Sequence, residues 1–251
     1  MKYPIYILLS IVLFTACQQD EVAPTGGKAV LELDLLLNGR PQMEVTRACD
    51  ADLVVDILDA NRAPYRHYDA GSVPQKIVLE PGTFYIQAYT DNQENWKSAN
   101  DGKGEACFFQ ETSVEMEYDM VKRLQMRVPM TNYAVGLQLP DLWDMLFSAY
   151  TFRLKSGGRT VVIRQGERAY FDLADGGFSY ALSATNTDGR TSSHSAISYL
   201  DVNAGKLYTL TYHYDSDANS GGIDIVIDDM TIDNNPIKRQ AETLTFMIHI
   251  I

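Results

Sequence analysis

Apolar and polar residues alternate along most of this chain, and this alternation is the feature that most restricts how the sequence can fold. Residues 29–35 alternate with a period of two, and residues 83–89 do the same after the turn at Pro81 and Gly82. A period of two places successive side chains on opposite faces of a β-strand, whereas an α-helix requires a period of about 3.6. Hydrophobic residues make up 45% of the chain, which is enough for a packed core. We therefore expect an all-β protein.

Turn residues separate the alternating segments. Residues 52–58 and 76–80 are rich in β-branched and large apolar residues, and Asp, Asn, Pro or Gly follow each of them. Strands joined by such turns are typical of an antiparallel sandwich or barrel. Residues 142–150 differ, because their apolar spacing suits a helix and Asp141 is a suitable N-cap. We expect one short helix there.

The strand pattern also repeats within the chain. The segments that resemble one another are residues 82–92 and 176–186, residues 54–59 and 151–156, and residues 122–128 and 206–212. The first two pairs are about 95 residues apart, which is the size of one sandwich domain. The sequence therefore predicts two tandem antiparallel β-sandwich domains that meet near Pro129. The alternative is that any two strands bounded by glycine look alike.

The predicted domain organisation follows from these segments. The first sandwich is expected over residues 28–128 and the second over residues 129–235, followed by a C-terminal strand or tail at 236–251. Residues 1–16 are expected to be a signal peptide and residues 17–27 a tether that contains Pro and Gly.

The N-terminal segment indicates export and lipidation. Lys2 precedes an apolar run at residues 5–14, which is too short to cross about 30 Å of hydrocarbon. Residues 14–17 resemble a bacterial lipoprotein signal, although Phe14 stands where leucine is usual. The resemblance implies that Cys17 becomes the mature N-terminus and carries acyl chains such as palmitate. Two or more acyl chains anchor a protein stably in a membrane.

The residues after Cys17 bear on the location. Residues 18–21 (Gln-Gln-Asp-Glu) resemble the acidic export tag that sends Bacteroidota-type lipoproteins to the outer face of the outer membrane. The alternative is a polar tether that happens to be acidic. We expect a protein anchored by lipid to the cell outer membrane and exposed at the surface.

Net charge excludes several partners. The chain contains 21 Lys and Arg against 33 Asp and Glu, for a formal charge of −12. Nucleic-acid binding depends on basic residues that neutralise phosphates, so no nucleic acid is expected. Docking on an anionic surface through charge is equally disfavoured, and the membrane contact is expected to be the lipid.

No catalytic residues, metal site or cofactor are predicted. The histidines (His67, His194, His213 and His249) are scattered, and no nucleophile motif, zinc-ligand spacing or phosphate-binding glycine loop accompanies them. Many aspartates occur in residues 215–233. They could bind calcium, but the favoured interpretation is that their charge prevents unwanted pairing at the edges of a sheet. Cys49 and Cys107 could form a disulfide or remain two separate thiols, and the second alternative is favoured. We expect a protein that is not an enzyme.

Trp96 is the candidate ligand-contact residue. It lies in a long polar segment that runs from Asn92 to Gly104, and an exposed indole offers a flat face for a sugar or a partner protein. The favoured alternative is that the loop folds back and Trp96 closes one end of a sandwich.

Several motifs occur together in an order that points to a family. They are the lipoprotein signal, residues 45–48 (Val-Thr-Arg-Ala), residues 79–84 (Leu-Glu-Pro-Gly-Thr-Phe) and residues 182–189. In this order they resemble Bacteroidota surface lipoproteins of domain-of-unknown-function family 4493, which are fimbrillin-like in style. The resemblance implies a surface lipoprotein of tandem β-sandwiches with a role in adhesion or fimbria-like assembly. The alternative function is a glycan-binding lipoprotein of a polysaccharide-capture system.

The fimbrillin resemblance gives Arg47 and Ala48 a further role. In fimbrillin-type subunits a trypsin-like protease cuts after an arginine that follows the first strand, and a strand of another subunit fills the groove that is left. The resemblance implies cleavage between Arg47 and Ala48, and the apolar segment 243–251 is a candidate donor strand. Sister subunits, other surface proteins or glycans are the expected partners. The alternatives are an ordinary loop arginine, a family pattern that is no longer cut, and a last strand that pairs within its own domain.

Overall fold

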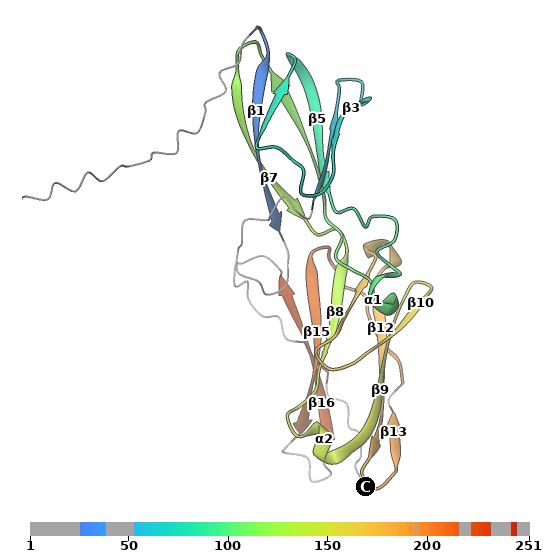
Figure 1. Ribbon diagram of the computed structural model, residues 1–251. Coiled ribbons are helices and arrows are strands. Elements are labelled where there is room, and N and C mark those ends of the chain that lie inside the picture. The colour runs from blue at the N-terminus through green and yellow to red at the C-terminus, as the bar shows by residue number, and fades with distance from the viewer. Residues whose placement is uncertain (1–25, 39–52, 194, 216–221, 232–241, 245–251) are drawn as a thin grey trace, which may run out of the picture.

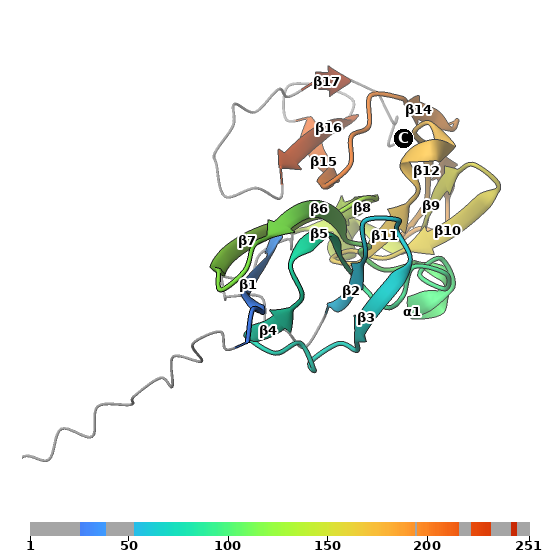
Figure 2. The same cartoon turned by 90° about the horizontal axis from the view of Figure 1, so that it is seen from above.

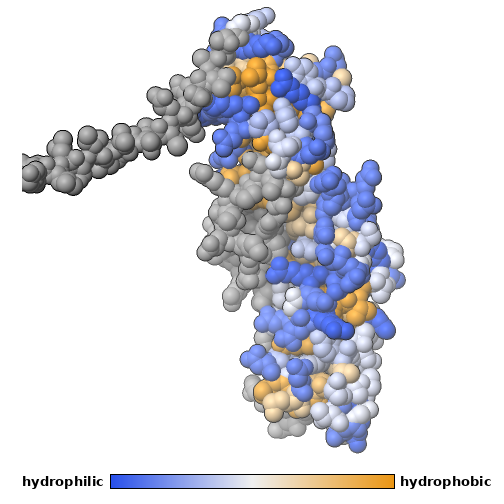
Figure 3. Space-filling view, viewed as in Figure 1, coloured by the Kyte–Doolittle hydropathy of each residue, from blue (hydrophilic) through white to orange (hydrophobic). Residues whose placement is uncertain are grey.

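The computed structural model describes residues 26–38, 53–193, 195–215, 222–231 and 242–244. These residues form two β-sandwiches that follow one another along the long axis of an elongated molecule (Figure 1). We call residues 29–129 the first sandwich and residues 133–244 the second sandwich. On the side shown in Figure 3 the surface is mainly hydrophilic, with smaller hydrophobic areas on both sandwiches.

The first sandwich has a three-stranded and a four-stranded sheet. The three-stranded sheet has the order β4 (Lys76–Leu79), β1 (Ala29–Asn38) and β7 (Val121–Pro129). The four-stranded sheet has the order β3 (Pro64–Tyr68), β2 (Val54–Leu58), β5 (Gly82–Tyr89) and β6 (Phe109–Met116). Both sheets contribute to one mainly aliphatic core, which includes Leu31, Leu35, Ile57, Ile86 and Val128.

The second sandwich has two five-stranded sheets. One has the order β11 (Arg168–Phe171), β8 (Tyr133–Gln138), β15 (Lys206–Asp215), β16 (Gly222–Thr231) and β17 (Glu242–Leu244). The other has the order β10 (Arg159–Ile163), β9 (Phe147–Ser156), β12 (Phe178–Asn186) and β13 (Thr191–Ser193), and β14 (Ile197–Tyr199) also pairs with β12. Its core is rich in aromatic rings, among them Tyr133, Trp143, Phe152, Phe178 and Tyr208.

The two sandwiches repeat one topology. The order β4-β1-β7 corresponds to β11-β8-β15, and the order β3-β2-β5-β6 corresponds to β10-β9-β12-β13. The three pairs of similar sequence segments fall on β5 and β12, β2 and β9, and β7 and β15, which are equivalent positions. The structure therefore supports an internal duplication. The second sandwich adds β16 and β17 beyond β15, at an edge where β7 of the first sandwich has no further strand among the described residues.

The predicted all-β class of tandem sandwiches is confirmed, with two differences in detail. Two strand pairs are parallel, β1 with β7 and β8 with β15, while the other pairings are antiparallel. The predicted helix at 142–150 is correct only for α2 (Trp143–Leu146), because β9 begins at Phe147 and pairs with β12. A second short helical segment, α1 (Ala99–Gly102), and a 3-10 turn, η2 (Leu173–Asp175), were not expected.

The finer organisation stays a prediction. The boundaries 28–128, 129–235 and 236–251 are kept as proposed limits, and β17 lies inside the predicted C-terminal segment, where it pairs with β16. None of the helices in the described ranges is both long and apolar enough to cross a membrane.

Candidate functional site

The candidate functional site of the first sandwich is the place that β1 occupies in the three-stranded sheet. β1 lies between β4, with which it is antiparallel, and β7, with which it is parallel from Val30 opposite Val121 to Asn38 opposite Pro129. Sequentially adjacent strands are usually neighbours, so pairing with a strand about 90 residues later joins the start of the first sandwich to its end. β1 therefore holds β4 and β7 together.

The inner face of β1 supplies part of the core. Leu31 and Leu35 are 0% and 2% exposed, and Ala29 and Leu33 are also buried beside them. Burial of a leucine side chain stabilises a fold by about 1.5–3 kcal/mol relative to its exposure. Removal of β1 would therefore open an apolar groove lined by the remaining core residues, with unpaired backbone groups on β4 and β7.

The outer face of β1 carries carboxylates. Glu32 Oε2 accepts a hydrogen bond from Arg123 Nε at 2.6 Å, and Glu32 Oε1 lies 3.7 Å from Lys76 Nζ. Two residues further, Asp34 Oδ2 accepts a hydrogen bond from Gln125 Nε2 at 3.1 Å. These groups run across all three strands of the sheet, so both faces of β1 contact its neighbours specifically.

The predicted processing and lipidation sites lie outside the described residues. Cys17 lies within the segment before residue 26, and Arg47 and Ala48 lie between residues 39 and 52, immediately after β1 in the sequence. Of the candidate donor segment 243–251, only residues 243 and 244 are described, as part of β17. Cleavage after Arg47 and strand donation therefore stay predictions.

Trp96 lies where the two sandwiches meet. It belongs to residues 90–107, which we call the junction loop, and its side chain is only 7% exposed. The Arg159 guanidinium lies 5.6 Å from the indole centroid and the Lys97 ammonium 5.3 Å from it. Figure 2 shows α1, which belongs to this loop, beside β10. Contact of Trp96 with a ligand stays a prediction, and it would require this loop to move.

Polar contacts fasten the junction loop to the second sandwich. Arg159 donates hydrogen bonds to the Gly102 carbonyl at 2.6 Å and to the Tyr170 carbonyl at 2.9 Å, and the Tyr170 amide donates to the Lys103 carbonyl at 2.7 Å. Lys103 Nζ also lies 2.8 Å from Glu167, and this hydrogen bond lowers the pKa of Glu167. The two sandwiches are thus joined by a specific interface as well as by the chain.

Cys107 lies at the end of the junction loop. Its backbone amide donates a hydrogen bond to Asn132 Oδ1 at 3.1 Å, and its carbonyl accepts one from the Thr131 amide at 2.7 Å. The thiol is free and buried, and burial raises its pKa to about 12. A thiol of this pKa is unreactive at neutral pH. Cys49 lies outside the described residues.

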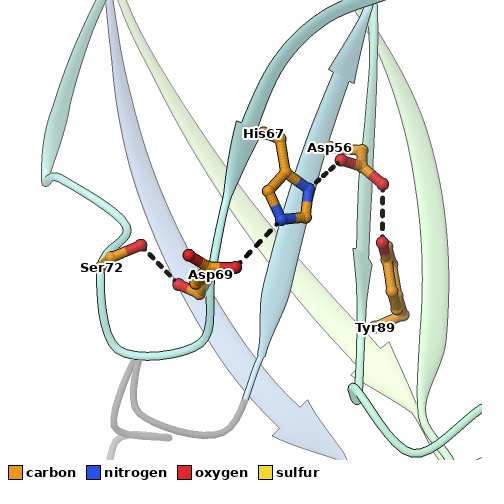
Figure 4. A network of polar contacts seen from close by, with 5 residues as sticks. All are labelled: Asp56, His67, Asp69, Ser72 and Tyr89. Atoms are coloured by element: carbon orange, nitrogen blue, oxygen red, sulfur yellow. Dashed lines mark hydrogen bonds and ion pairs between the residues drawn. The ribbon is translucent and has the colours of Figure 1, made fainter.

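A polar cluster that the sequence analysis did not identify lies on the four-stranded sheet (Figure 4). His67 Nδ1 is 2.7 Å from Asp56 Oδ1, and His67 Nε2 is 3.1 Å from Asp69 Oδ1. The Tyr89 hydroxyl donates to Asp56 Oδ2 at 2.7 Å, and the Ser72 hydroxyl donates to the Asp69 carbonyl at 2.6 Å. The alternation of apolar and polar residues in β2 places Asp56 on the outer face of the sheet. The turn that follows β2 predicts an antiparallel partner strand, and on that strand His67 lies opposite Asp56.

This cluster holds a histidine ring between two carboxylates. The hydrogen bonds that Asp56 and Asp69 accept from the His67 ring raise the pKa of His67. Because the two carboxylates approach opposite nitrogens of the ring, they do not converge on one point that a metal ion could occupy. Within the described ranges, no group of three or more His, Cys, Asp or Glu side chains could hold a metal ion.

A second group of outward side chains lies on the same sheet. Arg62 forms a two-point contact with Glu111, at 3.0 and 2.8 Å, and its guanidinium lies 4.2 Å from the centre of the Tyr85 ring. Phe109 of β6 is 40% exposed and lies opposite Tyr89 of β5. This face therefore combines aromatic rings with charged groups.

Comparison with known proteins identifies the family. The family model described as "Domain of unknown function (DUF4493)" matches residues 28–239, which is most of the chain. The chain belongs to the DUF4493 family. No curated protein matches this DUF4493 protein.

Solved structures resemble this DUF4493 protein in fold. A fimbrial assembly protein from Parabacteroides distasonis has a TM-score of 0.50 and 9% identity, and the similarity covers 87% of this chain and 98% of that one. A proposed cell adhesion protein from Bacteroides uniformis has a TM-score of 0.49 and 11% identity over 82% and 100% of the two chains. Another proposed cell adhesion protein, from Bacteroides eggerthii, has a TM-score of 0.48 and 13% identity, and the similarity covers 90% of this chain and 97% of that one. At these identities the similarity concerns the fold alone.

Proposed function

We propose that this DUF4493 protein is a surface lipoprotein of the outer membrane, without enzymatic activity, that serves adhesion or fimbria-like assembly. The observation that supports this most is the position of β1, an N-terminal strand inserted between β4 and β7 with its leucines in the core. The fold is shared with a protein named as a fimbrial assembly protein.

Assembly would begin with cleavage after Arg47. The cut would separate β1 from the rest of the chain and would also detach the protein from a lipid on Cys17. Once β1 leaves, β4 and β7 present unpaired backbone donors and acceptors beside exposed core side chains. Such an edge strongly favours recapture of a strand.

The replacement strand would come from another subunit. Residues 243–251 are apolar and strand-like and are one candidate donor. Contact between the β1 position of one subunit and the C-terminal end of the next is head-to-tail. Contacts of this kind produce open filaments when their rotation does not close a ring.

Intact-mass analysis of surface protein tests the cleavage. We expect a form that begins at Ala48 in the wild type and in Arg40→Ala, which alters another arginine in the same segment. Arg47→Ala should retain the N-terminus at Cys17. Detection of only the Cys17 form in the wild type would refute cleavage, and the protein would then act as an uncut lipoprotein.

Membrane fractionation tests the anchor separately. Cys17→Ala should give a soluble or unprocessed protein, because the acyl chains provide the membrane affinity. A processed Cys17→Ala protein that still fractionates with the outer membrane would refute lipidation at this residue.

Glycan binding is the second candidate function, and the outward face of the four-stranded sheet supports it. Tyr85, Tyr89 and Phe109 lie on this face beside charged groups, and sugars stack on aromatic rings. Binding of surface polysaccharides in affinity gels should weaken in Phe109→Ala and persist in Val162→Ala, which changes an exposed apolar residue of the second sandwich. Equal retardation of both variants would show that glycans do not bind to this face.

A further inference from the structure

The outward sides of β4 and β7 form a basic frame around β1. Lys76 of β4 and Arg123 of β7 lie in register on either side of Glu32. Gln125 lies opposite Asp34, and Arg127 lies opposite Leu36 two residues further along. Alternate side chains of β7 therefore place Arg, Gln and Arg at successive outward levels, each beside one outward residue of β1.

The carboxylates at these levels belong to β1 itself. Glu32 accepts from Arg123 and lies near Lys76, and Asp34 accepts from Gln125. Directly after β4, Glu80 Oε1 lies 3.1 Å from the Nζ atom of Lys28, which directly precedes β1. Loss of β1 would thus remove Glu32 from Lys76 and Arg123, which with Arg127 are basic residues on a protein whose formal charge is −12.

Arg127 shows that β1 does not use every level of this frame. Its neighbour on β1 is Leu36, and Arg127 has no hydrogen bond or ion pair within the described part of the chain. A strand with a carboxylate at the level of Leu36 would add an ion pair that β1 does not form. The frame is therefore more complementary to a more acidic strand than to β1.

We propose that Lys76, Arg123, Gln125 and Arg127 select the strand that occupies the β1 position. The selected occupant is a strand of another surface subunit with branched aliphatic side chains inward and carboxylates outward at the levels of Glu32 and Leu36. This inference rests on the proposed strand exchange and adds that outward charges decide which strand is accepted. Backbone pairing supplies affinity without distinguishing strands, and the inward pockets select only for apolar side chains, so outward charges add specificity among apolar strands.

The rule distinguishes between a second copy of this chain and a different subunit. Residues 243–251 contain no Asp or Glu, so as a donor this segment would offer no carboxylate to Arg123 or Arg127. A second copy would therefore be accepted less well than a subunit with an acidic donor strand. The frame favours assembly of unlike subunits at this position.

Peptide capture tests the proposal on the full chain. The protein is cut after Arg47, cleavage is checked by intact mass, the protease is inhibited, and labelled peptides compete in excess for the β1 position. The probes are residues 28–38, the same peptide with Glu32→Lys and Asp34→Lys, the same peptide with Leu36→Asp, and residues 243–251. Capture is read by native mass spectrometry.

We expect the native peptide to be captured about tenfold better than its lysine form, because reversal replaces attraction by repulsion at two levels. The Leu36→Asp peptide should be captured about threefold better than the native one, and residues 243–251 less well than either. These differences should fall to about twofold or less in 1 M salt, where charges are screened beyond roughly 3 Å.

Matched protein variants locate the effect. A Lys76→Glu, Arg123→Glu protein should prefer the lysine peptide, whereas Arg153→Glu with Lys155→Glu, which reverses exposed charges on β9, should behave as the wild type. Equal capture of native and lysine peptides by the wild type would overturn the charge rule and leave strand exchange standing. Capture of no peptide at all would overturn both the rule and the proposed exchange.

Discussion

The two sandwiches differ most at the equivalent strands β1 and β8. Both lie between an antiparallel and a parallel neighbour in the same sheet order. The Tyr133 hydroxyl of β8 is hydrogen-bonded to Ser156 Oγ at 3.0 Å inside the core. β1 instead inserts leucines at the N-terminal end of its sandwich. Under the proposed strand exchange, the same topology would hold β8 permanently and leave β1 exchangeable.

The hydrophobic cores of the two sandwiches also differ, in how specifically they hold the strand at this position. The second core contains interlocked aromatic rings, including Trp143 stacked on Phe147 with ring centres 4.1 Å apart. The first core contacts β1 mainly through aliphatic side chains, which many strands with alternating leucine or isoleucine could replace. Exchangeability therefore requires a generic inner face, and this explains why specificity would be assigned to the outer face.

The largest expected effect comes from the core contribution of β1. Leu31→Ala should lower the unfolding free energy of the first sandwich by about 2–5 kcal/mol, because it removes buried methyl groups and leaves a cavity. In denaturant titrations the transition of the second sandwich should stay in place. Val162→Ala, which is half exposed, is the control and should shift neither. An equal shift of all probes would show that the sandwiches unfold as one unit.

The junction loop decides how far the two sandwiches are independent. Arg159→Ala removes two hydrogen bonds to backbone carbonyls and the cation next to Trp96, and a cost of about 1–3 kcal/mol is expected for carbonyls left unpaired. Protease sensitivity of the junction loop should rise, while Arg153→Ala should leave it unchanged. An unchanged digestion pattern in Arg159→Ala would show that the loop does not couple the sandwiches.

The sequence predicted the strands well because alternation records which face of each strand is buried. It did not show that β1 pairs with β7, since a parallel neighbour about 90 residues away leaves no local signal. The contact of Glu32 with Arg123 depends on that pairing, and the contact of Trp96 with Arg159 depends on how the junction loop meets the second sandwich. The helix at 142–150 was overextended because Phe147 and Tyr150 fit helical spacing as well as the β9 pattern, and pairing with β12 decides the outcome.

A smaller effect separates two arginines of β7. Arg123→Ala removes the contact with Glu32 and should reduce stability by about 0.2–1 kcal/mol, the range for exposed ion pairs. Arg127→Ala, four residues further along the same face, should have almost no effect, because Leu36 offers it no charge. Chemical denaturation of both variants at low salt checks this. A greater loss in Arg127→Ala would contradict the assigned register of the outer face.

The smallest expected effect is a pH dependence that belongs to the first sandwich. Hydrogen bonds of the His67 ring to Asp56, and secondly to Asp69, raise the pKa of His67 above its ordinary value of 6.5. At the equivalent place in the second sandwich, Val162 faces Arg153, so the pair of His67 and Asp56 has no counterpart there. The contribution of His67 is therefore complete below the unfolded-state pKa of about 6.5 and is lost as pH rises through the higher folded-state value.

Melting temperatures of the wild type and His67→Ala should consequently differ most below about pH 6.5 and converge as the pH rises through the higher folded-state pKa of His67. Tyr89→Phe is the matched control, because it removes the other hydrogen bond to Asp56 without removing a group that titrates in this interval. Burial and the hydrogen bond to Asp56 raise the pKa of Tyr89 to about 12. The Tyr89→Phe difference should therefore stay constant with pH. A His67→Ala difference that was equally constant would mean that the histidine acts here through packing and neutral hydrogen bonds, and the sandwiches would then not differ in their response to pH.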